Sequence, residues 1–274
     1  MHNRYAFYYV IKKTPFSSKC QSMIEVLILS IIQGITEFLP VSSSSHLLLI
    51  SEFGNLKNHN LSIDVSLHIG SFFAVLTYFY KDIINFVKNK ELFFKIFISS
   101  LPLMIIGFVL TQTNLINEIR NIKVISWTTI IFGIFLYLGD KCKLDKNIKN
   151  DFNLKTALII GFFQILSLIP GVSRSGIGIT AARFLNYRRE DAAKISFLLS
   201  IPILGAVSFY GIKNIILSDE ISLSILNIAS IVLSFLFSYF TIKYFLKFIR
   251  KFSLKVFVIY RVLLGMILLT LIYL

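Results

Sequence analysis

Six apolar stretches, each close to the length of a membrane-spanning helix, dominate this sequence. They lie at about 65–80, 92–111, 124–139, 195–212, 221–242 and 256–274. A helix needs roughly 20 mostly apolar residues to cross a bilayer. Of the whole chain, 55% is hydrophobic and only 15% is charged, whereas soluble domains carry about 25% charged residues. The sequence therefore predicts an all-α integral membrane protein with six transmembrane helices.

Four further apolar pieces are too short to cross a bilayer alone, and they form two pairs. They lie at about 24–39, 46–53, 156–170 and 175–187. Each pair is interrupted by a proline, Pro40 in the first and Pro170 in the second, next to Ser or Gly. Irregular backbone at membrane depth is tolerated only where it is buried in protein or lines a wet cavity. We expect two re-entrant helical hairpins that share a cavity.

The two halves of the chain resemble each other weakly. Segment 33–43 resembles segment 164–173, because both begin with Gln and continue through apolar residues to Pro and Ser. One hairpin and three crossings in each half would invert the second half in the membrane. The sequence thus predicts a single membrane domain at 23–274, made of inverted repeats at about 23–140 and 155–274.

Basic residues are concentrated in a few loops. The chain has 28 Lys and Arg against 14 Asp and Glu, and the basic loops are 81–95, 140–155, 183–194 and 243–255. Such short runs between apolar segments indicate a cytoplasmic membrane face and not a nucleic-acid site. Threading the crossings through these loops brings the hairpin tips together near the bilayer midplane.

Residues 1–22 differ in character from the rest of the chain. Their basic residues would lie on the side opposite the other basic loops, and Met23 opens an apolar run directly. We expect 1–22 to be an N-terminal extension and Met23 to be a candidate start.

The first hairpin carries polar groups that are costly in a membrane. Gln33 and Glu37 are four residues apart and share one helix face. A central carboxylate costs roughly 2.5 to 3.5 kcal/mol, so Glu37 requires a partner or a task. Gln33 fits either a substrate contact or a helix-to-helix hydrogen bond. The four serines at 42–45 either cap the next helix or, with His46 as a base, supply a nucleophile.

The second hairpin contains an arginine in a glycine-flanked turn, Pro-Gly-Val-Ser-Arg-Ser-Gly at 170–176. The planar fork of Arg174 suits phosphate oxygens, and the surrounding backbone N–H groups suit an anion. The alternative is a salt bridge with Glu37 that only locks the hairpins together. Arg261 is expected to reach the lipid headgroups from the end of the last helix, and His68 to pack between helices.

At these motifs the sequence resembles the undecaprenyl-diphosphatase (bacitracin-resistance) family of bacteria, from Met23 onward. The matching motifs are 33–40 with its Gly-Ile-Thr-Glu-Phe-Leu-Pro run, the serines ending at His46, and 170–176. Two departures are relevant to the site. Ser45 replaces a usual Gly, and Gln33 replaces a frequent Glu, which weakens any model with two carboxylates on one metal.

The resemblance implies hydrolysis of undecaprenyl diphosphate to the monophosphate carrier lipid, with the aid of Mg²⁺ or Ca²⁺. It also implies a multi-pass protein of the bacterial inner membrane, in contact with lipid and allowing a homodimer. We expect Glu37, Ser43, His46 and Arg174 to be catalytic and Glu37 to hold the metal. The expected substrate-binding residues are Gln33, Ser42, Ser44, Ser173, Ser175 and Gly176.

Two other readings are weaker. A polyprenyl-phosphate flippase or secondary transporter would share the inverted-repeat architecture but would need no nucleophile. A membrane-bound acid phosphatase is disfavoured because its Lys-x6-Arg-Pro signature is absent.

Overall fold

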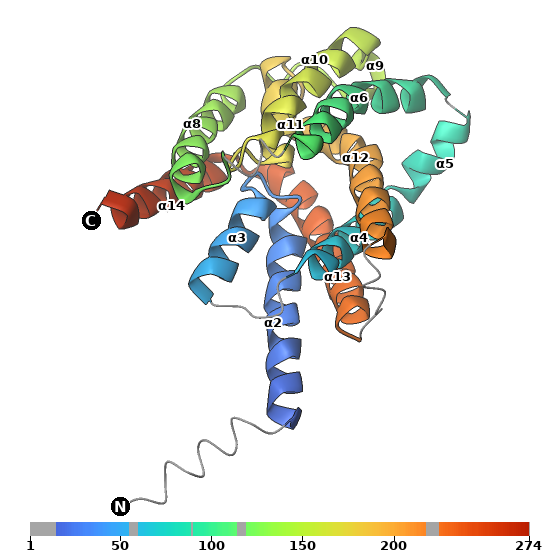
Figure 1. Cartoon of the computed structure of the whole chain (residues 1–274). Coiled ribbons are helices and arrows are strands. Elements are labelled where there is room, and N and C mark those ends of the chain that lie inside the picture. The colour runs from blue at the N-terminus through green and yellow to red at the C-terminus, as the bar shows by residue number, and fades with distance from the viewer. Residues whose placement is uncertain (1–14, 55–59, 89, 114–118, 218–224, 274) are drawn as a thin grey trace, which may run out of the picture.

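The protein is helical throughout the part of the chain that its computed structural model describes, residues 15–54, 60–88, 90–113, 119–217 and 225–273, where no strand occurs (Figure 1). Of the expected extension at 1–22, residues 1–14 lie outside these ranges. Helix α2 (Pro15–Thr36) runs through Met23 without a break.

Six of the described helices are long and apolar enough to cross a membrane. They are α4 (Leu61–Tyr78), α6 (Lys90–Gln112), α8 (Ile122–Asp140), α12 (Arg189–Leu217), α13 (Ile225–Lys251) and α14 (Lys255–Tyr273). Their positions match the six apolar stretches, so the prediction of an all-α, multi-pass membrane protein is confirmed.

The shorter elements include the two interrupted pairs. They are α3 (Ser43–Gly54), α5 (Tyr80–Lys88), α9 (Ile148–Asp151), α10 (Leu154–Gln164), η1 (Ile165–Leu168) and α11 (Arg174–Phe184). Helices α2 and α3 flank the first break, which we define as residues 37–42. Segment α10–η1 and helix α11 flank the second break, residues 169–173. Pro40 and Pro170 lie in these breaks because proline lacks the N–H that a helix interior requires.

Small residues allow the long helices to approach closely, which is how helices associate inside a bilayer. Gly70 of α4 lies so near the backbone of α13 that a Cβ atom there would overlap Ile231 O. The neighbouring Ser71 hydroxyl lies 3.2 Å from that of Ser234 and 3.0 Å from that of Ser238. Helices α4 and α13 are thereby fixed against each other.

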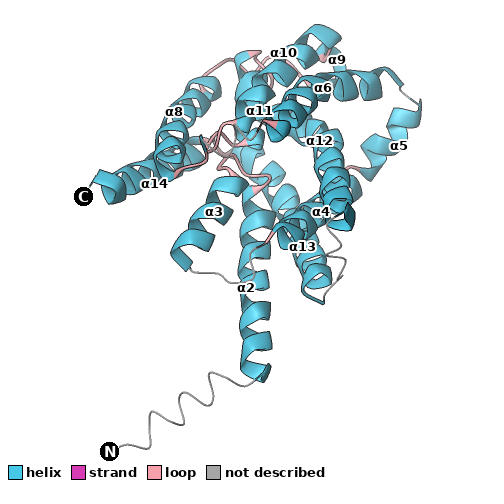
Figure 2. Cartoon of the chain, in the orientation of Figure 1, coloured by secondary structure: helices cyan, strands magenta, loops and turns pink. Residues whose placement is uncertain are grey.

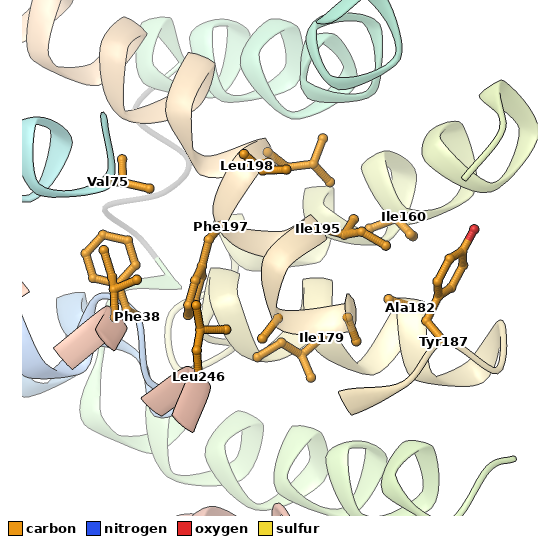
Figure 3. Packing of buried hydrophobic residues seen from close by; sticks show 14 of the residues in the cluster. Phe38, Val75, Ile160, Ile179, Ala182, Tyr187, Ile195, Phe197, Leu198 and Leu246 are labelled. Atoms are coloured by element: carbon orange, nitrogen blue, oxygen red, sulfur yellow. The ribbon is translucent and has the colours of Figure 1, made fainter. Parts of the chain in front are cut away.

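An aromatic cluster anchors the first break to the core. Figure 3 shows Phe197 of α12 beside Phe38. The centroid of the Phe197 ring lies 5.3 Å from that of Phe38, 6.4 Å from that of Phe79 and 5.9 Å from that of Phe245. Such edge and tilted contacts stabilise aromatic pairs beyond their buried area. Because Phe38 is 1% exposed, the backbone next to Glu37 has little freedom.

The basic loops contact one another on one side of the molecule. Arg189 Nε donates to Asp140 at 2.5 Å, and the backbone N–H of Leu254 donates to the same carboxylate at 3.0 Å. Lys194 pairs with Asp82 at 2.6 Å. These contacts join the ends of α8 and α13 to the beginnings of α5 and α12.

Candidate active site

The two breaks meet, and their loops converge where α3, α11 and α14 approach each other (Figure 2). Glu37 in the first break forms an ion pair with Arg174, the first residue of α11. The Ser175 hydroxyl donates to the carbonyl of Leu39 at 2.7 Å. The structure therefore joins the two polar segments that the sequence analysis expected to share a site.

The two oxygens of the Glu37 carboxylate have different partners. Oε1 accepts from Arg174, while Oε2 accepts from the Ser43 hydroxyl at 2.6 Å and from the Gln33 amide at 3.0 Å. The Glu37 side chain is 5% exposed and that of Arg174 is 15% exposed. A buried carboxylate is tolerated when it is paired and hydrogen-bonded in this way. Both alternatives for Arg174 stay open, because a phosphate could replace Glu37 at its guanidinium.

Gln33 extends the site to α4. The second N–H of its amide reaches Nδ1 of His68 at 3.0 Å, so this histidine faces the site and not only a neighbouring helix. Sequence reasoning missed it, although a histidine in an apolar helix carries the same cost as other polar groups there. The carbonyl oxygen of Gln33 is buried and accepts no hydrogen bond within the described residues. It is an acceptor that remains available to a ligand.

The serine run begins in a left-handed turn. Ser42 has a φ of 75°, a conformation that costs a residue with a side chain roughly 1 to 2 kcal/mol. Its hydroxyl lies 3.0 Å from that of Ser45, and both side chains are buried. The turn thus forms with Ser45 at the position where the family usually has Gly. Ser44 is exposed, and its predicted contact with substrate stays a prediction.

His46 lies in the first turn of α3 with both ring nitrogens occupied. Nδ1 lies 2.6 Å from the carbonyl oxygen of Ser42, and Nε2 lies 2.6 Å from the hydroxyl of Tyr260. The hydroxyl of Ser43 is bonded to Glu37 and not to His46. Sequence reasoning did not single out Tyr260, which is one of 12 tyrosines and lies 214 residues away from His46.

Ser173, at the end of the second break, and Ser175, at the start of α11, contact backbone groups of α11 and of the first break. The Ser173 hydroxyl accepts from the N–H of Gly176 at 3.1 Å and lies 3.1 Å from the Ser175 hydroxyl. Ser173 therefore caps α11 as its sequence position suggests. The predicted role of Ser173, Ser175 and Gly176 as phosphate ligands stays a prediction, because these groups already have partners.

The expectation for Arg261 is wrong. Its side chain does not reach toward headgroups but is 1% exposed. The guanidinium donates to Pro40 O at 3.1 Å, to Gly171 O at 3.0 Å and to Thr129 O at 3.2 Å. Carbonyl oxygens freed by the two breaks need donors that helices no longer supply. Arg261 provides them to both breaks at once.

The residues present could bind a divalent cation only if a phosphate ligand supplied further oxygen atoms. Within the described residues, no group of three or more His, Cys, Asp and Glu side chains lies together. Oxygen donors are nevertheless near one another, namely the Glu37 carboxylate, the Ser43 hydroxyl and the unpartnered carbonyl of Gln33. Mg²⁺ is commonly held by one or two carboxylates together with substrate phosphates and water. The site therefore suits a cation that arrives with a phosphate.

Comparisons with known proteins identify relatives over nearly the whole chain. Residues 26–267 match the family model of the bacitracin resistance protein BacA. An undecaprenyl-diphosphatase of Pelagibacter ubique is 51% identical over 253 residues, covering 92% of this chain and 98% of that protein. Undecaprenyl-diphosphatases of Saccharophagus degradans and a Jannaschia species are 40% and 36% identical, covering 89% and 92% of this chain and 96% and 99% of theirs. With its two motifs joined in one site, the chain belongs to the BacA family of bacitracin resistance proteins.

Proposed function

We propose that this protein hydrolyses undecaprenyl diphosphate to undecaprenyl phosphate and inorganic phosphate. The product is the carrier lipid of peptidoglycan synthesis, and its regeneration would counter bacitracin. The observation that carries the proposal is the contact between Glu37, Arg174 and Ser43 at the meeting of two helix breaks. The names of the relatives describe the same reaction.

Phosphoryl transfer depends mainly on positioning and on charge neutralisation. The terminal phosphate would take the place of Glu37 at the Arg174 fork, which matches phosphate oxygens in two parallel bonds. Glu37 would then be free to orient the Ser43 hydroxyl, which already donates to its Oε2 at 2.6 Å. Glu37 takes the proton of the Ser43 hydroxyl as the serine oxygen attacks the outer phosphorus. The bond from phosphorus to the bridging oxygen breaks, the lipid monophosphate leaves with that oxygen, and water later releases phosphate from the serine.

His46 is the second proton carrier of this proposal. Because Ser43 donates to Glu37, the imidazole is not needed to activate the serine at rest. It remains available to activate the water of the second step by accepting a proton from it. General acid–base groups of this kind typically contribute about 10² to 10⁴ in rate.

A divalent cation is part of the proposal. Glu37, Ser43 and the free carbonyl oxygen of Gln33 would hold it. When bound, it would neutralise the charge of the diphosphate oxygens. We expect chelation of divalent cations from the purified protein to abolish phosphate release and readdition of Mg²⁺ or Ca²⁺ to restore it. Full activity in the presence of the chelator would remove the cation from the proposal.

The finer membrane architecture also belongs to this proposal. We place the protein in the bacterial inner membrane, in contact with lipid, with the two interrupted pairs as re-entrant hairpins of an inverted repeat. The exposed position of Ser44 offers a test. An impermeant thiol reagent should label Ser44→Cys from only one side of sealed vesicles, which would also tell which face the site opens to.

The decisive assay measures phosphate release from a long-chain prenyl diphosphate by the pure protein in detergent with Mg²⁺ or Ca²⁺. Activity in the wild type and none in Glu37→Gln would support hydrolysis. No release under any of these conditions would instead favour a flippase or transporter. Trapping a phosphoserine at Ser43 would establish covalent attack, whereas near-full activity of Ser43→Ala would mean direct attack by water.

A further inference from the structure

The imidazole of His46 is held from two sides, and the two contacts fix its protonation pattern. Its Nδ1 lies 2.6 Å from the carbonyl oxygen of Ser42. A carbonyl oxygen can only accept, so Nδ1 carries the proton. In the neutral ring the lone pair is then on Nε2, and the hydroxyl of Tyr260 donates to it at 2.6 Å. Nε2 is thus the one nitrogen through which His46 can exchange a proton.

Tyr260 restrains the ring plane as well as the nitrogen. The rings of His46 and Tyr260 are stacked, with centroids 5.7 Å apart and an angle of 14° between their planes. The bond from Nδ1 to the backbone leaves the imidazole free to pivot about that contact. A second bond at Nε2 and the stacked ring remove this freedom.

The position of Tyr260 depends on the same backbone breaks that form the site. The next residue, Arg261, donates to Pro40 O and to Gly171 O, one in each break. On the same helix, Gly265 packs against the backbone of α8 near Ser126. Helix α14 is therefore clamped beside the breaks, and successive residues serve different purposes because they project about 100° apart around a helix.

We propose that Tyr260 is a positioning residue for His46, one that holds the imidazole in the Nδ1–H tautomer with its lone pair on Nε2, the nitrogen that takes up a proton during the reaction. This assignment rests on the proposed function. Helix α14 contains none of the sequence motifs of the site, and this assignment gives it a role in the reaction. Tyr260 acts through His46 and need not touch the substrate.

The test uses Tyr260→Phe, which keeps the stacked ring and removes only the hydroxyl, and Tyr244→Phe as a matched control. Tyr244 is 60% exposed on α13 and stacks on Phe240 outside the site. The first readout is the rate at which diethyl pyrocarbonate modifies His46, followed by mass spectrometry of the full-length protein. With the hydroxyl gone, the Nε2 lone pair is free, and the rate should rise about tenfold, the equivalent of one hydrogen bond. His68 in the same molecules provides an internal reference.

The second readout separates positioning from folding. Tyr260→Phe should lower kcat about tenfold and leave KM within about twofold of the wild type. The lost hydrogen bond orients His46, which carries the proton, and does not contribute to substrate binding. Thermal unfolding should stay near that of Tyr244→Phe. An unchanged rate of His46 modification, or an unchanged kcat, would overturn the assignment. Absence of phosphate release in the wild type would refute the proposed function, while the modification experiment would still decide whether Tyr260 holds His46.

Discussion

The two helix breaks that meet at the site have similar polar residues, but the hydrogen-bond partners of these residues differ. In the first break, the Glu37 carboxylate is bonded to side chains, those of Arg174, Ser43 and Gln33. At the second, the hydroxyl of Ser173 and that of Ser175, just inside α11, are bonded to each other and to backbone groups. Side-chain partners can be exchanged for a substrate, whereas backbone partners keep the loop in shape. The first break is suited to chemistry and the second to support.

The largest expected difference is between the serines that follow the two breaks, Ser43 in α3 and Ser175 in α11. Ser43→Ala should lower kcat on the order of 10⁴-fold or more, because removal of a nucleophile leaves only binding and charge stabilisation. Ser175→Ala should lower it no more than about tenfold, since it loses one hydrogen bond to Leu39 O. Both are measured as phosphate release in detergent. Equal losses in the two variants would contradict the division of roles.

Substitution of Arg261 should mainly lower stability, whereas substitution of Arg174 should mainly lower activity. Arg261→Met leaves the carbonyl oxygens of Pro40, Gly171 and Thr129 without their donor. Each unsatisfied buried acceptor costs about 1 to 3 kcal/mol, so we expect the loss of the donor to all three to lower the stability by at least about 3 kcal/mol. Arg174→Met should abolish activity with a smaller effect on thermal unfolding. A thermal shift of the same size in both variants would mean that Arg174 is also mainly structural.

The tight turns of the breaks offer a third comparison. Gly171 has a φ of 93°, and a Cβ atom there would overlap Thr128 Oγ1. Gly171→Ala should therefore cost about 2 kcal/mol or more. Ser42 also has a positive φ, and Ser42→Gly relieves that strain while losing the bond to Ser45. We expect its net effect to be within about 1 kcal/mol. Thermal unfolding of the two variants in the same detergent measures the difference, and an equal loss of stability would show that positive φ does not govern these turns.

The smallest expected effect concerns the glutamines that precede the breaks. Gln33 donates to Glu37 and His68, whereas Gln164 is 0% exposed with neither end of its amide hydrogen-bonded within the described residues. Gln164→Leu should be neutral or stabilising by up to about 1 kcal/mol, because it removes an unsatisfied buried polar group. Gln33→Leu should reduce activity. A marked loss of stability in Gln164→Leu would show that the amide has a bound partner such as water.

Predictions from the sequence were correct where the residue type alone sets the free energy of placing a side chain in the membrane. Six apolar stretches predicted six long helices, and Glu37 and Arg174 had to find partners because each charge is expensive alone. The same argument applied to Arg261 would have predicted its burial against polar groups. Its place near the end of an apolar run also allows contact with the headgroups, so position along the chain does not distinguish the two environments.

By itself, the sequence determined that the chain is a helical membrane protein and that its two Pro-interrupted segments contain polar groups that are costly in a membrane. Tertiary structure decided which atoms meet: Ser43 with Glu37, His46 with Tyr260, and Arg261 with both breaks. The physical reason is that apolar composition and the cost of buried charge are local properties of the chain. A hydrogen bond across 214 residues depends on how α14 packs beside α3, which no local pattern encodes.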